Sequence, residues 1–453
     1  MLVKPYLDLL RLAFPIILAN AAVPILGLVD TAMIGQTGTA SDLGAIALAS
    51  LIFSFVYWGF GFLRMGTTGF IAQAAGARHH QELHALVFRT LFIAVAIGLA
   101  LILLQQPIGW VATTTLSASN DVNERVQSYF YLRIWGAPAT LTTFALLGIL
   151  IGMGWTRTLL AVQLLLNGLN ILFNVIFVLG FGLGVKGIAL GTVCAEWITV
   201  FFALYWVLKK MGIRYPKARV VALKNRILNR KKLWALVHVN SDIMVRTLAL
   251  ISGFAWFAQQ GAQLGDETLA ANHLLLQFIT LSAFFLDGYA NVAEMRAGQA
   301  YGAVDKQRFQ TEVRRTTVLA AITAALLGVG IYASGSYTIP WLSQDHHVQQ
   351  LAIQHLPYAA LYIVVSFAAF QLDGIFIGAT QSRAMRNATV LALAVLIALG
   401  TWWSALYGNR GLWVALVVYI TIRAVVLALY YPMLLKRLTP LSPKSLPSYN
   451  VKG

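Results

Sequence analysis

The sequence predicts an all-α integral membrane protein in which twelve transmembrane helices form two pseudo-symmetric six-helix lobes. Of the 453 residues, 59% are hydrophobic and only 11% are charged, which is too few charges to cover the surface of a soluble protein of this size. Twelve apolar runs are long enough to cross about 30 Å of hydrocarbon as helices. The two halves of the chain also repeat each other, a pattern typical of two-lobed transporters.

The apolar runs divide the chain into two halves of six. They lie near 9–36, 44–76, 85–112, 126–154, 158–181 and 187–210, and then near 235–258, 268–300, 316–341, 352–379, 384–407 and 411–435. We therefore expect an N-lobe at 1–210, a basic cytoplasmic linker at 211–234, a C-lobe at 235–435 and a cytoplasmic tail at 436–453. The first run is too long for a signal-peptide core and lacks a cleavage pattern, so it is predicted to be retained.

The internal repeat is long and free of gaps. Residues 41–160 match residues 267–386 at a constant offset of 226, and the string QAAGA at 73–77 recurs as QAYGA at 299–303. Because each half has six helices and starts on the same side of the membrane, the repeats are parallel and related by an axis along the membrane normal.

Basic residues gather on one side of the predicted membrane. The segment from Lys209 to Lys232 carries ten basic residues and no acidic one, whereas the loops on the other side carry mainly acidic residues. Both termini and the linker are therefore predicted to face the cytoplasm. The net charge of +17 indicates anionic membrane lipids as partners, and no nucleic acid, because no basic segment is interleaved with aromatic residues on a soluble module.

Cysteine and histidine usage argues against a metal, a cofactor and an enzyme. The single cysteine, Cys194, lies in an apolar run, so no disulfide, zinc site or haem attachment can form within the chain. The eight histidines show no ligand spacing, and the pairs His79-His80 and His346-His347 are adjacent in loops, where they cannot share a helix face.

Asp30 lies in the first apolar run, where a charge costs at least about 2.5–3.5 kcal/mol. No basic residue lies within two helical turns of it. Burial disfavours the carboxylate anion, so Asp30 is a candidate proton carrier. The alternative is that it only ties two helices together through a hydrogen bond. Pro15 and Pro24 each remove a backbone donor from the same helix and are candidate hinges.

A second group of polar residues is predicted near this aspartate. Asn167, Asn170 and Asn174 follow one another at spacings of three and four, which places three amides on one helix face. Thr192 and Glu196 are one turn apart in the next run. Such residues often serve only as hydrogen-bonding contacts between helices, at about 0.6 kcal/mol each. Three amides on one face beside a buried aspartate instead predict a hydrated polar pocket in the N-lobe.

The C-lobe has its own candidates, which do not copy those of the N-lobe. Asp287, Asn291 and Glu294 lie at i, i+4 and i+7 and form one polar stripe. Asp373 lies beside the repeated Gly-x-x-x-Gly segment, where its counterpart in the first half is Leu147.

The remaining membrane charges are predicted to form ion pairs. Asp242 and Arg246 are one turn apart and are expected to pair with each other. Arg64, Arg133 and Arg423 could contact a substrate, but we expect them to be partners of the buried carboxylates.

Several strings carry a resemblance that covers nearly the whole chain. They are Pro15, GLVDTA at 27–32, RMGTTG at 64–69, LDG at 286–288, GQAYGA at 298–303 and LDG at 372–374. Each is weak alone, but in this order and spacing they are specific. With them the chain resembles the multidrug and toxic compound extrusion (MATE) family, and more narrowly its DinF branch.

The resemblance implies a V-shaped pair of six-helix bundles that exports amphipathic, often cationic compounds in exchange for protons or sodium. It implies that Asp30 is the coupling residue of the N-lobe and that its protonation is linked to bending at Pro15. It also assigns Asn170, Asn174 and Thr192 to the same polar site. Many relatives have an aspartate at the position of Asn174, and the missing charge weakens a sodium site here.

The NorM-like branch of the family also uses acidic residues of the C-lobe for a cation site. Asp373 matches one of them, but the other position falls near Arg246, which argues against sodium in this lobe.

We therefore predict a monomeric, proton-coupled antiporter of the cytoplasmic membrane that exports amphipathic organic compounds by alternating access. One alternative is a sodium-coupled exporter of the same family. Another is a flippase for lipids or polysaccharide precursors, against which the count of twelve helices and the Asp30 motif argue. A membrane enzyme would need clustered histidines, cysteines or carboxylates at an interface. A passive channel would line one continuous pore.

Overall fold

A computed structural model describes residues 4–115 and 119–438. All regular elements within these ranges are helices. The N-lobe elements are α1 (Lys4–Thr37), α2 (Ala40–Gly59), α3 (Phe62–Gly76), α4 (His80–Leu103), α5 (Gln105–Thr115), α6 (Asn120–Arg133), a 3-10 turn η1 (Ile134–Gly136), α7 (Ala137–Gly152), α8 (Thr156–Asn174), a π-helix η2 (Val175–Gly180) and α9 (Gly184–Lys210). The linker contains α10 (Pro216–Ile227). The C-lobe comprises α11 (Arg230–Gln263), α12 (Asp266–Gly302), α13 (Lys306–Leu342), α14 (His346–Gly378) and α15 (Ser382–Arg437).

The described part of the chain contains 11 candidate membrane spans, and the last of them crosses twice. Helix α15 has 56 residues. At 1.5 Å per residue it would be about 84 Å long, nearly three times the hydrocarbon thickness. Its backbone breaks at Gly408, whose φ of 56° and ψ of −140° belong to no helix and suit only glycine. The fold therefore has twelve crossings in two six-helix lobes, as predicted.

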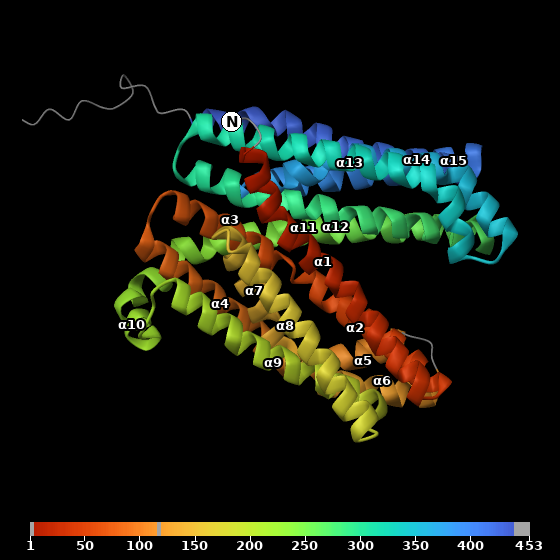
Figure 1. Cartoon of the computed structure of the whole chain (residues 1–453), viewed down its shortest axis with the longest axis horizontal. Coiled ribbons are helices and arrows are strands. Elements are labelled where there is room, and N and C mark those ends of the chain that lie inside the picture. Colours follow the sequence, from red (N-terminus) through yellow and green to blue (C-terminus); the bar gives the residue numbers. More distant parts are fainter. Residues whose placement is uncertain (1–3, 116–118, 439–453) are drawn as a thin grey trace, which may run out of the picture.

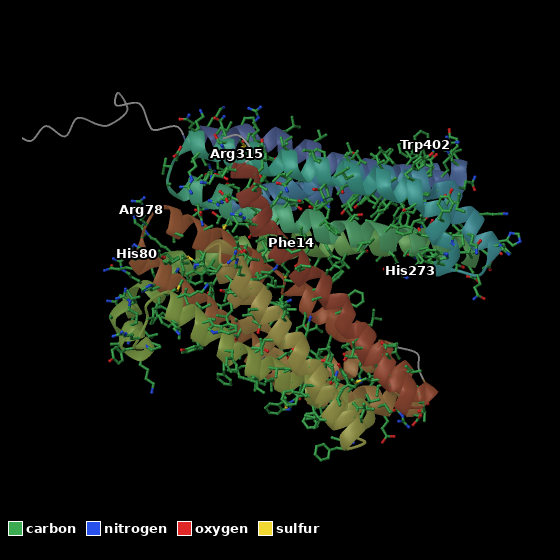
Figure 2. The ribbon with its side chains drawn as sticks, in the orientation of Figure 1. Phe14, Arg78, His80, His273, Arg315 and Trp402 are labelled. Carbon is green, nitrogen blue, oxygen red and sulfur yellow. The ribbon has the colours of Figure 1, made fainter. Side chains whose placement is uncertain are left out.

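The two lobes form a V (Figure 1). They converge at the end that carries the start of α1 and the linker helix α10, and they diverge towards the other end. Arg78, His80 and Arg315 mark the convergent end, and His273 and Trp402 mark the divergent end (Figure 2). Helix α1 belongs to both sides of the V, because it packs on α8 of the N-lobe and on α12 of the C-lobe.

The lobes meet in a contact that we call the seam, formed by residues 64–76 of α3 and 287–302 of α12. Glycines bring the two backbones together at the convergent end. A Cβ on Gly76 would lie 1.9 Å from the carbonyl oxygen of Gln299, and a Cβ on Gly302 would lie 2.1 Å from that of Gln73. No residue other than glycine fits such an approach.

Two glutamines close the seam in the same symmetric way. Gln73 Nε2 donates to the carbonyl oxygen of Gly378 at 2.8 Å, and Gln299 Nε2 donates to that of Gly152 at 3.2 Å. Both donors and both acceptors are related by the offset of 226 found in the sequence. The repeat therefore preserves a reciprocal contact between the lobes.

Helix ends at the seam obey the same symmetry. The residues Arg78, Gly154, Val304 and Thr380, two pairs separated by 226, all have φ between 53° and 74°. Each donates its N–H to the carbonyl three residues back, and the next N–H reaches five residues back, as in a Schellman cap. Three of the four are not glycine, which is uncommon in this region of φ.

The linker is fastened to the N-lobe. Leu223 and Ile227 of α10 pack against Ala85 of α4. The buried Arg89 of α4 donates from Nε to the carbonyl of Ile227 at 3.1 Å and from Nη2 to that of Arg226 at 2.5 Å. A cation is thus placed at the C-terminus of α10, where the helix dipole favours it.

Candidate functional site

Four of the six polar residues predicted in the N-lobe form one hydrogen-bonded chain. Asn174 Nδ2 donates to Asp30 Oδ1 at 2.6 Å and to Asn170 Oδ1 at 2.8 Å. Asn170 Nδ2 donates to Thr192 Oγ1 at 2.9 Å, and Thr192 in turn donates to the carbonyl of Ile188 at 2.9 Å. We call these four side chains, Asp30, Asn174, Asn170 and Thr192, the Asp30 chain.

The local fold explains how three helices meet at this chain. The spacing of four places Asn170 and Asn174 on one face of α8, and α8 packs against both α1 and α9. Gly191 of α9 gives the amide room, because a Cβ there would lie 2.3 Å from Asn174 Oδ1. The α-helix ends at Asn174 and continues as the π-helix η2, a feature that often marks functional sites.

Asp30 is the only acidic member of the Asp30 chain. Its side chain is half-buried, and none of the described residues forms an ion pair with it. The carboxylate is held by one amide donor instead of a cation. Asn174 Oδ1 is also buried and has no hydrogen-bond partner among the described residues, so the chain has acceptor capacity that the protein leaves open.

Two residues predicted for the same pocket lie outside the chain. Asn167 Nδ2 donates to the carbonyl of Ala22 in α1 at 3.1 Å. Glu196 forms a bidentate ion pair with Arg133 of α6, at 2.6 and 2.8 Å, and the Arg133 guanidinium lies 5.3 Å from the Tyr57 ring. Arg133 is thus the partner of a buried carboxylate, as expected. Glu196 is neutralised by this pair and does not extend the Asp30 chain.

The two predicted hinge residues lie in a helix that is continuous from Lys4 to Thr37. Pro15 is buried in the part of α1 that packs on the C-lobe. There, a Cβ on Gly288 of α12 would lie 2.3 Å from Ile17 Cγ1, so the two helices touch closely. The side chain of Pro24 lies outside the described residues. The role of both prolines as hinges stays a prediction.

The C-lobe holds Asp373 between two guanidinium groups. Arg423 Nη2 of α15 donates to Asp373 Oδ2 at 2.6 Å, and Arg246 of α11 pairs with the same oxygen. All three side chains are at most 10% exposed. Two guanidinium groups therefore balance the charge of Asp373 at one of its oxygens, while Oδ1 is buried without a hydrogen-bond partner among the described residues.

The predicted pair between Asp242 and Arg246 is wrong. Asp242 Oδ1 pairs with Arg386 at 2.6 Å, and its other oxygen accepts from the Ser382 hydroxyl at 2.9 Å. Arg246 turns instead to Asp373. Spacing along one helix permits the predicted pair, but neighbouring helices present partners with more hydrogen bonds, which buried charges require.

The stripe on α12 faces the other lobe. Arg64 Nη1 of α3 donates to Asn291 Oδ1 across the seam at 3.0 Å. Glu294 is 3% exposed and faces Thr68 of α3, while Asp287 is half-buried. The sequence indicated a stripe within the C-lobe, and only the arrangement of helices places it between the lobes. The sequence feature that indicates this contact between the lobes is Arg64, a basic residue within an apolar run.

Within the described ranges 4–115 and 119–438, no three His, Cys, Asp or Glu side chains cluster as they would around a metal ion. The Asp30 chain offers one carboxylate with amide and hydroxyl groups. Such a set can bind and release a proton but provides few charged ligands for a hard cation.

Comparisons with known proteins agree with this architecture. The MatE family model matches residues 15–176 and 244–403, one segment in each half. The chain is 36% identical to DNA damage-inducible protein F of Escherichia coli (strain K12) over 420 residues, which cover 92% of this chain and 90% of that protein. It is 24% identical to the multidrug resistance protein NorM of Vibrio cholerae, with 93% of each chain covered.

Solved structures show the same fold at low identity. The chain is similar to a multidrug resistance MATE family transporter in an outward-facing conformation, with a TM-score of 0.86, 19% identity, and 96% of this chain and 97% of that chain covered. A MATE structure in a bent conformation also gives a TM-score of 0.86, at 19% identity and 95% coverage of both chains. With the family model matched in both halves and 36% identity to a relative over 92% of the chain, the protein belongs to the MATE family, a family of multi-pass membrane transporters and not of enzymes.

Proposed function

We propose that this protein is a proton-coupled antiporter that exports amphipathic, often cationic organic compounds across the cytoplasmic membrane by alternating access. Its relatives include a protein named for multidrug resistance, which supports a role in compound export. The observation that carries the choice of proton is the Asp30 chain, in which a membrane carboxylate is held by an amide and by no described cation.

We further propose that the convergent end faces the cytoplasm. The linker with its eight basic residues lies there, and so does the start of α1. Exposed basic side chains of α10, including Lys217 and Lys224, would then face the anionic lipid headgroups of the inner leaflet. In this orientation the V diverges towards the outside. We expect the transporter to act as a monomer.

The coupling step rests on what one proton changes at Asp30. As an anion, Asp30 accepts the hydrogen bond from Asn174 and is solvated by the Asp30 chain. As a neutral acid it becomes a donor and no longer needs that solvation. Because Asp30 is on α1 and Asn174 on α8, protonation weakens the tie between these helices. The shape of α1 and the binding of a cationic substrate would both respond, with Pro15 as the proposed bending point.

Protons suit this site better than sodium. A hard cation such as sodium needs several oxygen ligands and is favoured by negative charge among them, and the neutral Asn174 removes one carboxylate that many relatives have. Glu196 is held by Arg133, and Asp373 is held by Arg246 and Arg423. Asp30 is therefore the one carboxylate near the chain that the described cations leave unpaired.

The test is antiport in proteoliposomes. Ethidium movement should follow an imposed pH gradient and should not respond to a sodium gradient at fixed pH and membrane potential. Asp30→Asn should abolish the response, since an amide cannot carry a proton. Asp8→Asn is the matched control, because Asp8 lies on the same helix in an exposed pair with Arg11. Transport driven by sodium alone, or full activity of Asp30→Asn, would refute the proposal.

A further inference from the structure

Glu294 is a buried carboxyl group that the proposed mechanism does not use. It is 3% exposed and lies in the seam, where α12 packs on α3 and α14. A Cβ on Gly378 of α14 would lie 2.3 Å from the carbonyl oxygen of Glu294, so the backbones are in direct contact. No described residue forms an ion pair with its side chain, and Glu294 Oε1 has no hydrogen-bond partner among them.

The charges around Glu294 do not balance it. The positive charge of Arg64 on α3 attracts the Glu294 carboxylate, and the negative charge of Asp287 on α12 repels it. The Thr68 hydroxyl faces the same group. Arg64 donates a hydrogen bond to Asn291, the amide between the two acids of the stripe. One guanidinium from the N-lobe thus serves two carboxyl groups of the C-lobe.

The other packed helices bring no free countercharge to Glu294. Among the buried charges of α14 and α11, Asp373 and Arg246 pair with each other and act on Asp287, and Asp242 is paired with Arg386. Helix α7 has no ionisable side chain, and α1 contributes its apolar stretch at 13–17. The charged residues of α13 that could reach this depth, Arg314 and Arg315, have no recorded pair with Glu294.

We propose that Glu294 is a second proton-binding residue, which keeps its proton while the seam is closed and releases it when the lobes separate at the convergent end. A buried carboxylate without a cation is strongly disfavoured, so the closed seam requires the neutral acid. Separation of α3 and α12 would remove Arg64 and admit water, which solvates the anion. This inference rests on the proposed proton-driven function only for the direction in which the proton moves across the membrane.

The position of Glu294 fits a site with access from one side at a time. At 1.5 Å per residue, it lies about 12 Å along α12 from Gly302 at the convergent end, and Asp287 lies about 22 Å away. The glycine and glutamine contacts of the seam separate Glu294 from the convergent end. On the other side the stripe continues to Asp287, which is half-buried. A proton can therefore exchange with the divergent side while the seam is closed, and with the convergent side only after the seam has opened.

The experiment measures seam opening as a function of pH. Spin labels at His80→Cys and Arg308→Cys, two exposed sites on either side of the convergent end, are introduced together with Cys194→Ser, which removes the only native cysteine. Distances are recorded between pH 5 and pH 9 for the whole protein in nanodiscs. Because low pH favours the protonated, closed seam, the closed-to-open ratio should fall with rising pH, by up to tenfold per unit for one proton.

Four variants decide the result. Glu294→Gln should keep the seam closed throughout, while Glu294→Asp should keep a pH response with a shifted midpoint. Glu267→Gln, an exposed neutralisation on the same helix, should behave as the parent protein. Glu294→Met is measured as well, so that a folding defect of the glutamine variant does not decide the outcome.

The proposal is overturned if the parent shows no pH response, or if Glu294→Gln and Glu294→Met retain the full response. It is also overturned if Asp287→Asn or Asp30→Asn, and not Glu294→Gln, removes the response. Failure of the proposed function is seen separately, as normal antiport by Asp30→Asn in proteoliposomes, and leaves the seam measurement intact.

Discussion

Gly302→Ala is expected to push the lobes apart at the convergent end. The new Cβ would lie 2.1 Å from the carbonyl oxygen of Gln73, about 1.3 Å short of the 3.4 Å at which ordinary contact begins. The obstacle is backbone, and it cannot turn aside as a side chain would. The strain must be relieved by moving α12 away from α3.

The magnitude follows from the two states of a transporter. Overpacking of this kind costs about 1–3 kcal/mol. The cost exists only while the seam is closed, because the two backbones part when it opens. The ratio of open to closed seam should therefore rise about 5- to 150-fold. Gly76→Ala, the symmetry mate, meets a carbonyl at 1.9 Å and should act in the same direction.

The assay uses the same spin-label pair at residues 80 and 308. Gly330→Ala is the matched control, since a Cβ on this α13 glycine meets nothing within 4 Å. The Gly302 and Gly76 variants should shift the distance distribution towards longer values, and the Gly330 variant should not. If Gly302→Ala folds and leaves the distribution unchanged, the seam is not the contact that holds this end closed.

Three further outcomes are expected. Asn174→Asp should make antiport respond to a sodium gradient, because a second carboxylate beside Asp30 supplies a charged ligand; flux at fixed pH would show it. Pro15→Ala should restore a backbone donor, stiffen α1 and reduce ethidium antiport, and unchanged flux together with unchanged spin-label distances in α1 would refute the hinge. Arg423→Gln should lower the free energy of unfolding by about 3–5 kcal/mol, because Asp373 loses one of its two partners. A melting temperature in detergent well below that of the control Arg410→Gln, a substitution at an exposed arginine, would confirm it.

The fold was predictable because membrane helices obey few rules. Hydrocarbon forces every span to satisfy its own backbone, so apolar runs locate helices directly. The predicted gap between runs ending at 407 and beginning at 411 contains Gly408, where the backbone breaks. The Asp30 chain could also be predicted, since polar groups in an apolar lobe gather and helix periodicity fixes the face on which Asn170 and Asn174 lie.

The partners of the buried charges could not be predicted in the same way. The contacts predicted for Glu196 and Arg246 differ from those in the structure. An ion pair between helices depends on how far each helix is rotated about its axis and where it crosses its neighbour. The spacing of residues along one helix does not determine either of these quantities. The repeat does contain information about the seam. Its glycines and glutamines recur at an offset of 226, which indicates a contact that both halves need.

The carboxyl groups Asp373, Asp30 and Glu294 have three different kinds of surroundings. In the C-lobe, Asp373 is paired with two guanidinium groups, which carry a permanent positive charge. In the N-lobe, Asp30 has an amide, which tolerates either protonation state. Glu294 has neither and lies between the lobes. We therefore expect a proton gradient to act on Asp30 and on Glu294, and the movement of one lobe against the other to change the surroundings of Glu294 most directly.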